Sequence, residues 1–343
     1  MNPAIIQRQW WHNAVVYQIY PRSFNDSNGD GIGDIPGIIA KLDHIKQLGA
    51  KIIWLSPVFQ SPMDDNGYDI SDYCAIAPEF GTMADMDSLI AQAAQRGIKI
   101  VMDLVVNHTS DQHPWFIESK SSIDNPKRDW YIWKDAKADG SEPNNWESFF
   151  TPKAWEFDVP SEQYYLHLFS EKQPDLNWAN PEVRDAIYQM MHFWLKKGLG
   201  GFRMDVINMI GKPADYPDAS IFDQGVAGWE HWANNGLCHQ YLREMHDQVL
   251  QHYDVLTVGE TPFTTPLDGQ FYSNPARNEL SMIFHFEHVS IDREEHNAVK
   301  KDFNLVEYKA IMNKWQTQLQ GKGWNSLYWS NHDQPRPVSR YGD

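Results

Sequence analysis

The sequence predicts an α/β fold in which parallel β-strands alternate along the chain with the helices that cover them. Short apolar runs alternate with segments whose apolar residues recur at helical spacing, which is typical of β/α units. Several of these runs end in polar residues, and a parallel barrel collects its functional groups at such strand ends. A long irregular stretch interrupts the alternation after the third run, which indicates an insertion.

Apolar runs predict strands at residues 15–20, 52–55, 98–106, 201–206, 255–260, 280–286 and 326–330. Helical spacing predicts helices at residues 38–48, 83–96, 181–197, 237–253 and 305–319, the first two of which end at Gly49 and Gly97. Because bare sheet edges are unfavourable, we expect a (β/α)8 barrel of the TIM type whose eighth strand is missing. The chain is then truncated after its seventh strand.

The irregular stretch runs from about residue 108 to residue 173 and is rich in Trp, Asp, Asn, Ser and Pro. It is too long for an ordinary connection between a strand and a helix. We therefore predict a first barrel segment at residues 1–107, an inserted domain at 108–173 and a second barrel segment at 174–343.

Charge and composition exclude several classes of partner. The chain has 29 Lys and Arg against 46 Asp and Glu, a formal net charge of −17. It has no clustered basic stretch of the kind that nucleic acid or an anionic membrane surface requires. No stretch approaches the ~20 apolar residues that span a bilayer, and residues 1–11 carry no apolar run typical of a signal peptide. We expect a cytoplasmic monomer that acts on a small molecule.

Three carboxylates, an arginine and two histidines are expected to gather at the strand ends; they are Asp205, Glu260, Asp333, Arg203, His108 and His332. Arg203 and Asp205 stand two residues apart on one strand, so their side chains face the same way. A neighbouring guanidinium keeps a carboxylate ionised, as a nucleophile requires, although a structural ion pair would give the same pattern. Gathered carboxylates favour acid/base chemistry on a polar substrate, with sugar hydrolysis as the leading candidate.

A loop rich in Asp, Asn and Gly at residues 26–34 predicts a site for a hard cation. Side-chain oxygens alternate at Asp26, Asn28 and Asp30, and Asp34 follows after Ile32. The glycines between them allow a tight wrap. No Glu closes the loop as in a helix–loop–helix calcium site, and no Lys-Ser or Lys-Thr follows as in a phosphate loop. A solvated turn would have the same composition.

Several stretches, in order along the chain, resemble glycoside hydrolase family 13, the α-amylase family. They are residues 10–12, 16–21, 64–70, 103–110, 173–178, 201–208 and 329–333, and they include Gly-Phe-Arg-Met-Asp-Val at 201–206 and Asn-His-Asp at 331–333. Within the family, the chain resembles the oligo-1,6-glucosidases and the bacterial dextran glucosidases. The resemblance implies a catalytic (β/α)8 barrel with an inserted domain B after the third strand. The eighth strand and the C-terminal β-domain of the family lie outside this chain.

The resemblance also implies roles for individual residues. Asp205 matches the nucleophile, Glu260 the acid/base and Asp333 the transition-state stabiliser. The residues that match contacts to the glucose at the cleaved bond are Asp65, Tyr68, His108, Arg203 and His332, with less certain matches at Phe150, Phe169 and Gln173. Val206 matches a position that distinguishes α-1,6 from α-1,4 cleavage. The residues that match a structural calcium site are Asp26, Asn28, Asp30, Asp34 and, through its carbonyl, Ile32.

The implied reaction is retaining, exo-acting hydrolysis of α-1,6-glucosidic bonds at the non-reducing end of isomalto-oligosaccharides and dextran fragments, with release of glucose. The alternatives in the same family are an α-1,4-glucosidase, a trehalose-6-phosphate hydrolase and a sucrose isomerase. Sucrose isomerases carry an arginine-rich segment near the sixth strand, which residues 287–293 do not match well. A non-catalytic relative would lack the acidic trio. Residues 261–265 vary within the group and leave the preferred chain length open.

Overall fold

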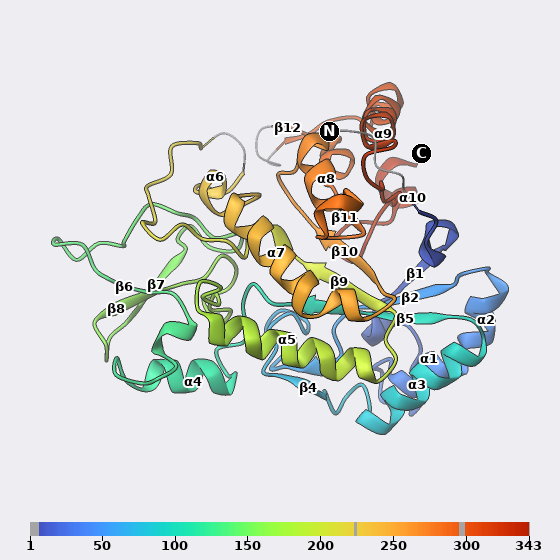
Figure 1. Ribbon diagram of the computed structural model, residues 1–343, viewed down its shortest axis with the longest axis horizontal. Helices are drawn as coiled ribbons and strands as arrows, with labels where there is room; N and C mark the ends of the chain where they lie inside the picture. The colour runs from blue at the N-terminus through green and yellow to red at the C-terminus, as the bar shows by residue number, and fades with distance from the viewer. Residues whose placement is uncertain (1–6, 223–224, 295–298, 343) are drawn as a thin grey trace.

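A curled parallel sheet of six strands forms the centre of the computed structural model, which describes residues 7–222, 225–294 and 299–342 (Figure 1). The strand order is β1-β2-β5-β9-β10-β11, and all neighbours are parallel. The strands are β1 (Val16–Ile19), β2 (Ile52–Leu55), β5 (Lys99–Val105), β9 (Gly201–Asp205), β10 (Leu256–Glu260) and β11 (Met282–Phe284).

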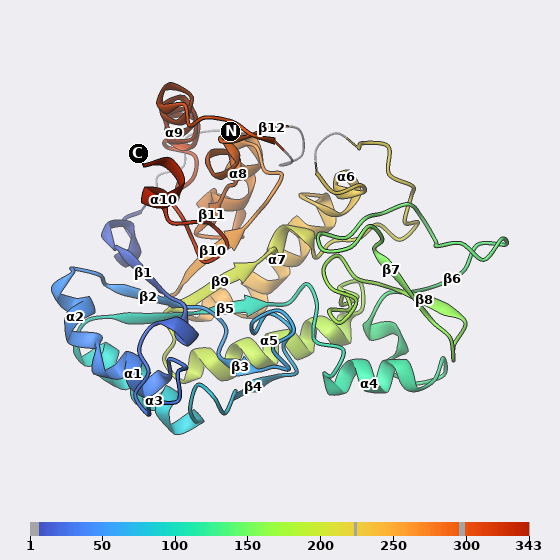
Figure 2. The same ribbon diagram turned by 180° about the vertical axis from the view of Figure 1, so that it is seen from behind.

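Helices connect these strands and cover one face of the sheet. They are α1 (Ile35–Ala40), α2 (Leu42–Gln47), α3 (Met83–Gln95), α5 (Pro181–Lys196), α7 (Gly236–Gln248), α8 (Pro266–Ser273) and α9 (Leu305–Leu319). Figures 1 and 2 show α5 and α7 on one side of the sheet, with the strands coming forward when the view is reversed. The helix α5 begins at the cap residue Asn180 and buries Val183, Ile187 and Trp194 against the sheet.

The predicted helix at residues 38–48 is two short helices instead. Lys41 leaves the helical region of backbone angles, with φ −104° and ψ 3°, so α1 and α2 are separate. The first of them also begins earlier than predicted, because the Asp34 side chain accepts a hydrogen bond from the Gly37 N–H and caps the helix. The predicted helix at 237–253 likewise ends at Gln248, and a 3₁₀ turn follows it.

The predicted strand at residues 326–330 is wrong. Only Asn325 pairs with the sheet, through a single parallel bridge to Ile283. Leu327 and Trp329 are 60% and 61% exposed. A strand is stabilised by a continuous ladder of hydrogen bonds, and residues 326–330 form none, although the ring of Tyr328 lies 4.8 Å from Phe284 on β11.

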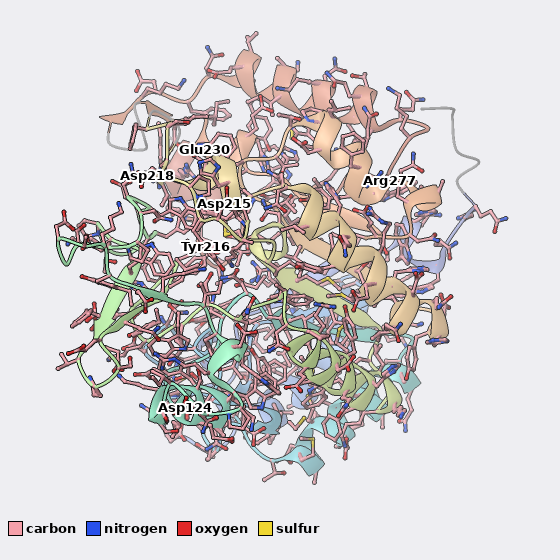
Figure 3. All side chains as sticks on the ribbon, turned by 60° about the vertical axis from the view of Figure 1, so that its left-hand side comes forward. Asp124, Asp215, Tyr216, Asp218, Glu230 and Arg277 are labelled. Atoms are coloured by element: carbon pink, nitrogen blue, oxygen red, sulfur yellow. The ribbon has the colours of Figure 1, made fainter. Side chains whose placement is uncertain are left out.

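The stretch predicted as an insertion has a small sheet of its own. Its strands β6 (Trp133–Asp135), β7 (Trp155–Asp158) and β8 (Gln163–Leu166) are antiparallel in the order β6-β8-β7, and α4 (Pro114–Ser121) precedes them. A loop from the second barrel segment packs on this unit, because Trp146 Nε1 donates to the Pro217 carbonyl at 2.8 Å. Figure 3 shows Asp215, Tyr216, Asp218 and Glu230 gathered on this loop and the adjoining helix.

The remaining elements are short. They are β3 (Phe59–Gln60), β4 (Asp72–Ile76), β12 (Arg293–Glu294), β13 (Val299–Lys300), α6 (Trp229–Trp232), α10 (Pro337–Tyr341) and the 3₁₀ turns η1 (Trp10–Asn13), η2 (Pro21–Ser23), η3 (Arg128–Trp130), η4 (Ile207–Met209), η5 (Leu250–His252), η6 (Pro275–Arg277) and η7 (Glu287–Ser290). In the part of the chain that the structure describes, no helix is long and apolar enough to cross a membrane.

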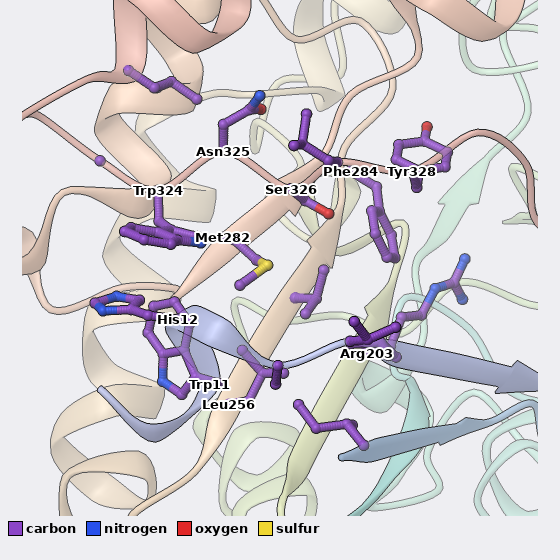
Figure 4. Close-up of a pocket in the computed structure, with 18 of the residues that line it drawn as sticks. Trp11, His12, Arg203, Leu256, Met282, Phe284, Trp324, Asn325, Ser326 and Tyr328 are labelled. Carbon is purple, nitrogen blue, oxygen red and sulfur yellow. The ribbon is translucent and has the colours of Figure 1, made fainter. Parts of the chain in front are cut away.

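The inner face of the curled sheet has an apolar layer below and a polar layer above. The apolar layer consists of Ile52, Val101, Leu256, Val258 and Met282. Since every second side chain of a strand faces the same way, the inward set continues along the strands to Asp103, Arg203, Asp205 and Glu260. A cavity of about 760 Å³ lies inside the curl and reaches Arg203 at one end (Figure 4). The polar strand ends thus lie above an apolar layer that lines this cavity.

Gly201 allows β9 to fit between its two neighbours. It pairs with Val101 and Leu256 at a φ of +136°, and a Cβ there would lie 1.8 Å from the Leu256 carbonyl oxygen. We expect Gly201→Ala to lower the free energy of unfolding by at least about 3 kcal/mol, measured by chemical denaturation. Gly236→Ala is the control, because a Cβ there meets nothing within 4 Å. Equal stability of the two variants would contradict the close approach.

Candidate active site

One buried arginine joins three carboxylates from neighbouring strands. Arg203 Nη1 donates to Asp103 Oδ1 and to Asp205 Oδ1, both at 2.6 Å, and Arg203 Nη2 donates to Glu260 Oε2 at 2.5 Å. The carboxylates come from β5, from the end of β9 and from the end of β10. All four side chains are at most 10% exposed. The structure therefore brings Asp205 and Glu260 together on one guanidinium.

The charges in this cluster do not balance, since one cation faces three carboxyl groups. Burial raises the pKa of Asp205 well above its usual range; Arg203 lowers it, and Glu260 raises it further. Burial also raises the pKa of Asp103, against the effect of Arg203. The expectation that the guanidinium alone keeps Asp205 ionised is therefore too simple, because removal from water outweighs it.

Asp103 is a member of the cluster that the sequence analysis did not select. Besides Arg203, its carboxylate accepts hydrogen bonds from Trp54 Nε1 at 2.9 Å and from the Tyr68 hydroxyl at 3.1 Å. A signal for it exists in the sequence, since Asp103 interrupts the apolar run at residues 100–106. A charge in such a strand needs a buried partner.

Aromatic rings enclose His332 beside this cluster. Its ring stacks on Tyr68 at 5.3 Å with an angle of 3° and on Tyr20 at 6.0 Å with an angle of 16°. Its Nδ1 lies 2.9 Å from Gln18 Nε2 on β1. Burial and the charge of Arg203 lower the pKa of His332, so its ring is neutral near pH 7.

Asp333 lies further out than the other predicted carboxylates. Its side chain is 52% exposed, and its Oδ1 lies 3.3 Å from His332 Nε2. Among the hydrogen bonds of the described residues, none joins it to Arg203, Asp205 or Glu260. It nevertheless faces the same region, because its charge acts on the pKa of Asp65.

A second group of predicted contacts forms around Gln173, at the exit of the insertion. Gln173 Nε2 donates to Asp65 Oδ2 at 3.0 Å and lies 3.2 Å from His108 Nε2. Burial lowers the pKa of His108 to about 4 and raises the pKa of Asp65 to about 6. The ring of Phe169 lies 4.9 Å from His108, and Phe150, which is 56% exposed, lies 5.6 Å from Phe169.

A buried lysine holds the insertion exit against the end of β5. Lys212 Nζ contacts Asp175 Oδ2 at 2.7 Å and donates to Asn107 Oδ1 at 2.6 Å. Asp175 also accepts from Asn107 Nδ2 at 3.2 Å and from the Leu168 N–H at 3.0 Å. The sequence analysis did not select these residues, and they fix the chain on both sides of Gln173.

Val206 follows Asp205 in an unusual backbone conformation. Its φ of +35° and ψ of 39° are left-handed, which is rare for a β-branched residue. Its N–H donates to Glu260 Oε2 at 3.2 Å. Its side chain is 7% exposed and belongs to an apolar cluster with Met209 and Trp232. The strained turn thus contacts one carboxylate and directly follows the other.

The loop predicted to bind calcium folds around its own backbone. Asp26 Oδ1 accepts from the Gly29 N–H at 2.7 Å, and Asp26 Oδ2 accepts from the Gly31 N–H at 2.8 Å. Asn28 and Asp30 accept from N–H groups two residues further on, whereas Asp34 caps α1. Across the described residues, no group of three or more His, Cys, Asp or Glu side chains converges as a metal cluster. The side chains of this loop offer oxygen atoms, the ligand type that hard cations prefer.

Comparison with known proteins adds to this geometry. The family model "Alpha amylase, catalytic domain" matches residues 18–343. The chain belongs to the α-amylase family. Its six parallel strands are part of the (β/α)8 barrel of that family.

Two of the relatives found share more than half of their aligned residues with this chain. An oligo-1,6-glucosidase of Parageobacillus thermoglucosidasius is 58% identical over 341 residues, which cover 98% of this chain and 60% of that protein. A glucan 1,6-alpha-glucosidase of Streptococcus pneumoniae is 55% identical over 342 residues, again 98% of this chain and 60% of that protein. The chain thus spans about 60% of the length of these relatives.

Solved structures show the same architecture. The trehalose-6-phosphate hydrolase of Bacillus licheniformis, a mutant in complex with a ligand, superposes with a TM-score of 0.95 at 51% identity, covering 98% of this chain and 60% of that one. The isomaltulose synthase SmuA of Protaminobacter rubrum superposes with a TM-score of 0.94 at 44% identity, with the same coverage. Relatives with different substrates therefore share this scaffold.

The pKa of Asp65 leads to a prediction about stability and pH. In the folded state it is about 6, mainly through burial, whereas an unfolded chain has about 3.9. The folded state therefore binds this proton more tightly, and that contribution to stability is lost as the pH rises from about 4 to about 6. Asn does not titrate, so the stability of Asp65→Asn relative to the wild type should rise between about pH 4 and about pH 6. We expect the difference in the free energy of unfolding to grow by about 1 kcal/mol, after allowing for solvent exposure, and to stay constant at higher pH.

Denaturant unfolding at pH 4, 5, 6 and 7 measures the difference. Asp185→Asn, at an exposed position of α5, is the matched control and should show a constant difference from wild type. A constant difference for Asp65→Asn as well would show that the Asp65 carboxyl is not held at a raised pKa.

Proposed function

We propose that this protein hydrolyses α-1,6-glucosidic bonds at the non-reducing end of isomalto-oligosaccharides and releases glucose with retained configuration. The observation that carries the proposal is the pair Asp205 and Glu260, bound by one guanidinium at the ends of adjacent parallel strands. Retaining glycosidases require two carboxyl groups about 5–5.5 Å apart. Relatives named for α-1,6 cleavage, at 55–58% identity, support the choice of bond.

In the proposed mechanism, Asp205 attacks the anomeric carbon while Glu260 gives its proton to the leaving oxygen. The C–O bond to the leaving sugar breaks, and a covalent glucosyl ester forms on Asp205. Glu260, now ionised, takes a proton from water, whose oxygen attacks the same carbon and releases Asp205. Arg203 donates a hydrogen bond to each of the two carboxylates and thereby orients both groups.

The other predicted residues fit supporting roles in this proposal. We propose that the glucose at the cleaved bond is bound by Tyr68, His108, Arg203 and His332, and that Asp65 with Gln173 closes the pocket. We propose that residues 108–173 act as the inserted domain B and supply Phe150 and Phe169, and that Asp333, near the rim, stabilises the transition state. Cytoplasmic location and a monomeric state remain predictions from the sequence.

A trehalose-6-phosphate hydrolase is the second candidate, because a solved enzyme of that name superposes at a TM-score of 0.95. Glucose release from isomaltose, maltose, panose, sucrose and trehalose-6-phosphate by the complete protein separates these activities. We expect isomaltose and panose to be cleaved and trehalose-6-phosphate to be left intact. The reverse order of rates would favour the second candidate.

The roles of the two carboxyl groups can be separated by the leaving group. Asp205→Asn should abolish turnover of every α-glucoside, because no ester can form. Glu260→Gln should lower kcat for isomaltose about 10²- to 10⁴-fold, but much less for an activated aryl glucoside, which needs little protonation. Glu307→Gln, at a partly exposed surface position that pairs with Lys301, is the control and should be fully active. Equal losses on both substrates would argue against Glu260 as the acid.

Val206 leads to a prediction about the choice of bond. A branched apolar side chain after the nucleophile limits the space for a leaving sugar, and an α-1,6 bond has one more torsion with which to avoid it. The wild type should prefer isomaltose to maltose by at least about tenfold, and Val206→Thr or Val206→Ala should raise the relative rate on maltose. Val226→Thr, in the same apolar cluster, is the control and should leave the ratio unchanged. An unchanged ratio in the Val206 variants would assign the residue to packing alone.

We also propose that the loop at residues 26–34 binds calcium through Asp26, Asn28, Asp30, Asp34 and the carbonyl of Ile32. When bound, the ion would hold the loop together and take no part in the reaction. A chelator should lower the melting temperature of the wild type, since the folded state alone binds the ion. Asp30→Ala should abolish this dependence, whereas Asp139→Ala, in another exposed turn, should keep it. A wild-type melting temperature that ignores the chelator would refute calcium binding.

A further inference from the structure

A glutamine on the first strand of the sheet reaches the histidine that precedes Asp333. Gln18 lies on β1 opposite Trp54 of β2, so both side chains point to the inside of the curled sheet. The Nε2 atom of Gln18 is 2.9 Å from His332 Nδ1 and donates to Ser56 Oγ at 3.3 Å. Since an amide nitrogen has two hydrogens, these two acceptors use both of them.

The ring of His332 is held in one orientation by its neighbours. It stacks on Tyr68 and on Tyr20, and Trp54 meets it edge-on at 5.8 Å with an angle of 80°. Its side chain is only 10% exposed. The ring is neutral near pH 7, so one of its nitrogens carries a proton and the other is bare. The groups beside the two nitrogens therefore decide which one has the proton.

Two neighbours of His332 favour the same tautomer. The Gln18 amide nitrogen can only donate, so the Nδ1 atom that it faces has to be the bare one. The Nε2 atom lies 3.3 Å from Asp333 Oδ1, and an ionised carboxylate can only accept, so a proton on Nε2 suits this side. The opposite tautomer would set one N–H against another and a bare nitrogen against a carboxylate.

We infer that Gln18 is a positioning residue that fixes His332 in the tautomer with its proton on Nε2. The Nε2–H group is thereby directed towards Asp333 and towards the glucose at the cleaved bond. This inference rests on the proposed function, in which His332 binds that glucose and Asp333 stabilises the transition state. Gln18 acts on the substrate only through His332. A single hydrogen bond thus connects the first strand of the sheet to the segment that carries Asp333.

Nitrogen NMR of the complete protein with labelled histidine reads the tautomer directly, because the protonated and the bare nitrogen of a neutral ring give different signals. The loss of signals in His332→Leu identifies those of this ring. At pH 7 the wild type should carry the His332 proton on Nε2. A proton on Nδ1 instead would overturn the inference.

Gln18→Met keeps the length of the side chain but has no donor. His332 should then populate both tautomers, and kcat/KM for isomaltose should fall about three- to tenfold, the scale of one hydrogen bond. Gln270→Met is the matched control, because Gln270 is buried and its Nε2 donates to the Gln318 carbonyl at 3.1 Å, between α8 and α9. It should keep the wild-type kcat/KM and the wild-type signals of His332. An unchanged tautomer in Gln18→Met would overturn the inference.

Gln18→Glu is the second variant and does not depend on the folding of the first. A carboxylate at this position accepts from Nδ1, so His332 should carry a proton on Nδ1, whether its ring is neutral or charged. A bare Nδ1 in this variant would contradict the contact between the two side chains.

A double-mutant cycle separates positioning from packing. If Gln18 acts through His332, Gln18→Met should lower kcat/KM no further in a protein that already carries His332→Leu. Additive losses would show that Gln18 serves packing and would overturn the inference. If the wild type cleaves no glucoside, the proposed function fails, whereas the NMR signals still decide whether Gln18 selects the tautomer of His332.

Discussion

The buried guanidinium of Arg203 is the interaction on which the rest of the site depends. A cation this deep is tolerated only with carboxylate partners, and the carboxylates need it equally. Three neighbouring strands contribute one partner each, so the parallel register that places Asp103 beside Arg203 also determines where Glu260 lies. Trp54 and Tyr68 then bond to Asp103, and Tyr68 stacks on His332. The strands thereby fix the positions of Tyr68 and His332, which belong to loops.

A second buried cation does the same for the insertion. The insertion has its own small sheet, and it shares an apolar cluster with residues of the second barrel segment, among them Val206 and Trp232. The position of Gln173 depends on where the exit of the insertion lies relative to the barrel. Lys212 fixes the position of this exit by binding Asp175, which follows Gln173 by two residues. Because Lys212 comes from the segment after β9 and Asn107 from the end of β5, this ion pair locks the insertion to the strands that carry Arg203 and Asp103.

The periodicity of the sequence was enough to predict most of the strands and helices, because packing on one face of a helix or strand is a local pattern. The strand ends also placed Arg203, Asp205 and Glu260 in one region, since parallel strands share an edge. Other features depend on partners distant in sequence. In place of the strand expected at 326–330, only the preceding residue, Asn325, pairs with the sheet. Asp103 and Lys212 become conspicuous only once their partners are in place. The roles of the site residues came from resemblance to a family, which periodicity does not supply.

The backbone just beyond the two central carboxylates carries strain in both cases. Val206 follows Asp205 at φ +35°, and Phe263 comes three residues after Glu260 at φ +59°. Each conformation is unfavourable for its side chain, and neighbouring groups maintain it. The turn at Val206 aims an N–H at Glu260, and the turn at Phe263 sets its ring against Trp229. A glycine at either position would relax the backbone but would remove the side chain that faces the apolar cluster. At both strained turns, a sharp change of backbone direction brings loop side chains close to the carboxylates. The regular strands that carry these turns supply the stability that offsets the strain.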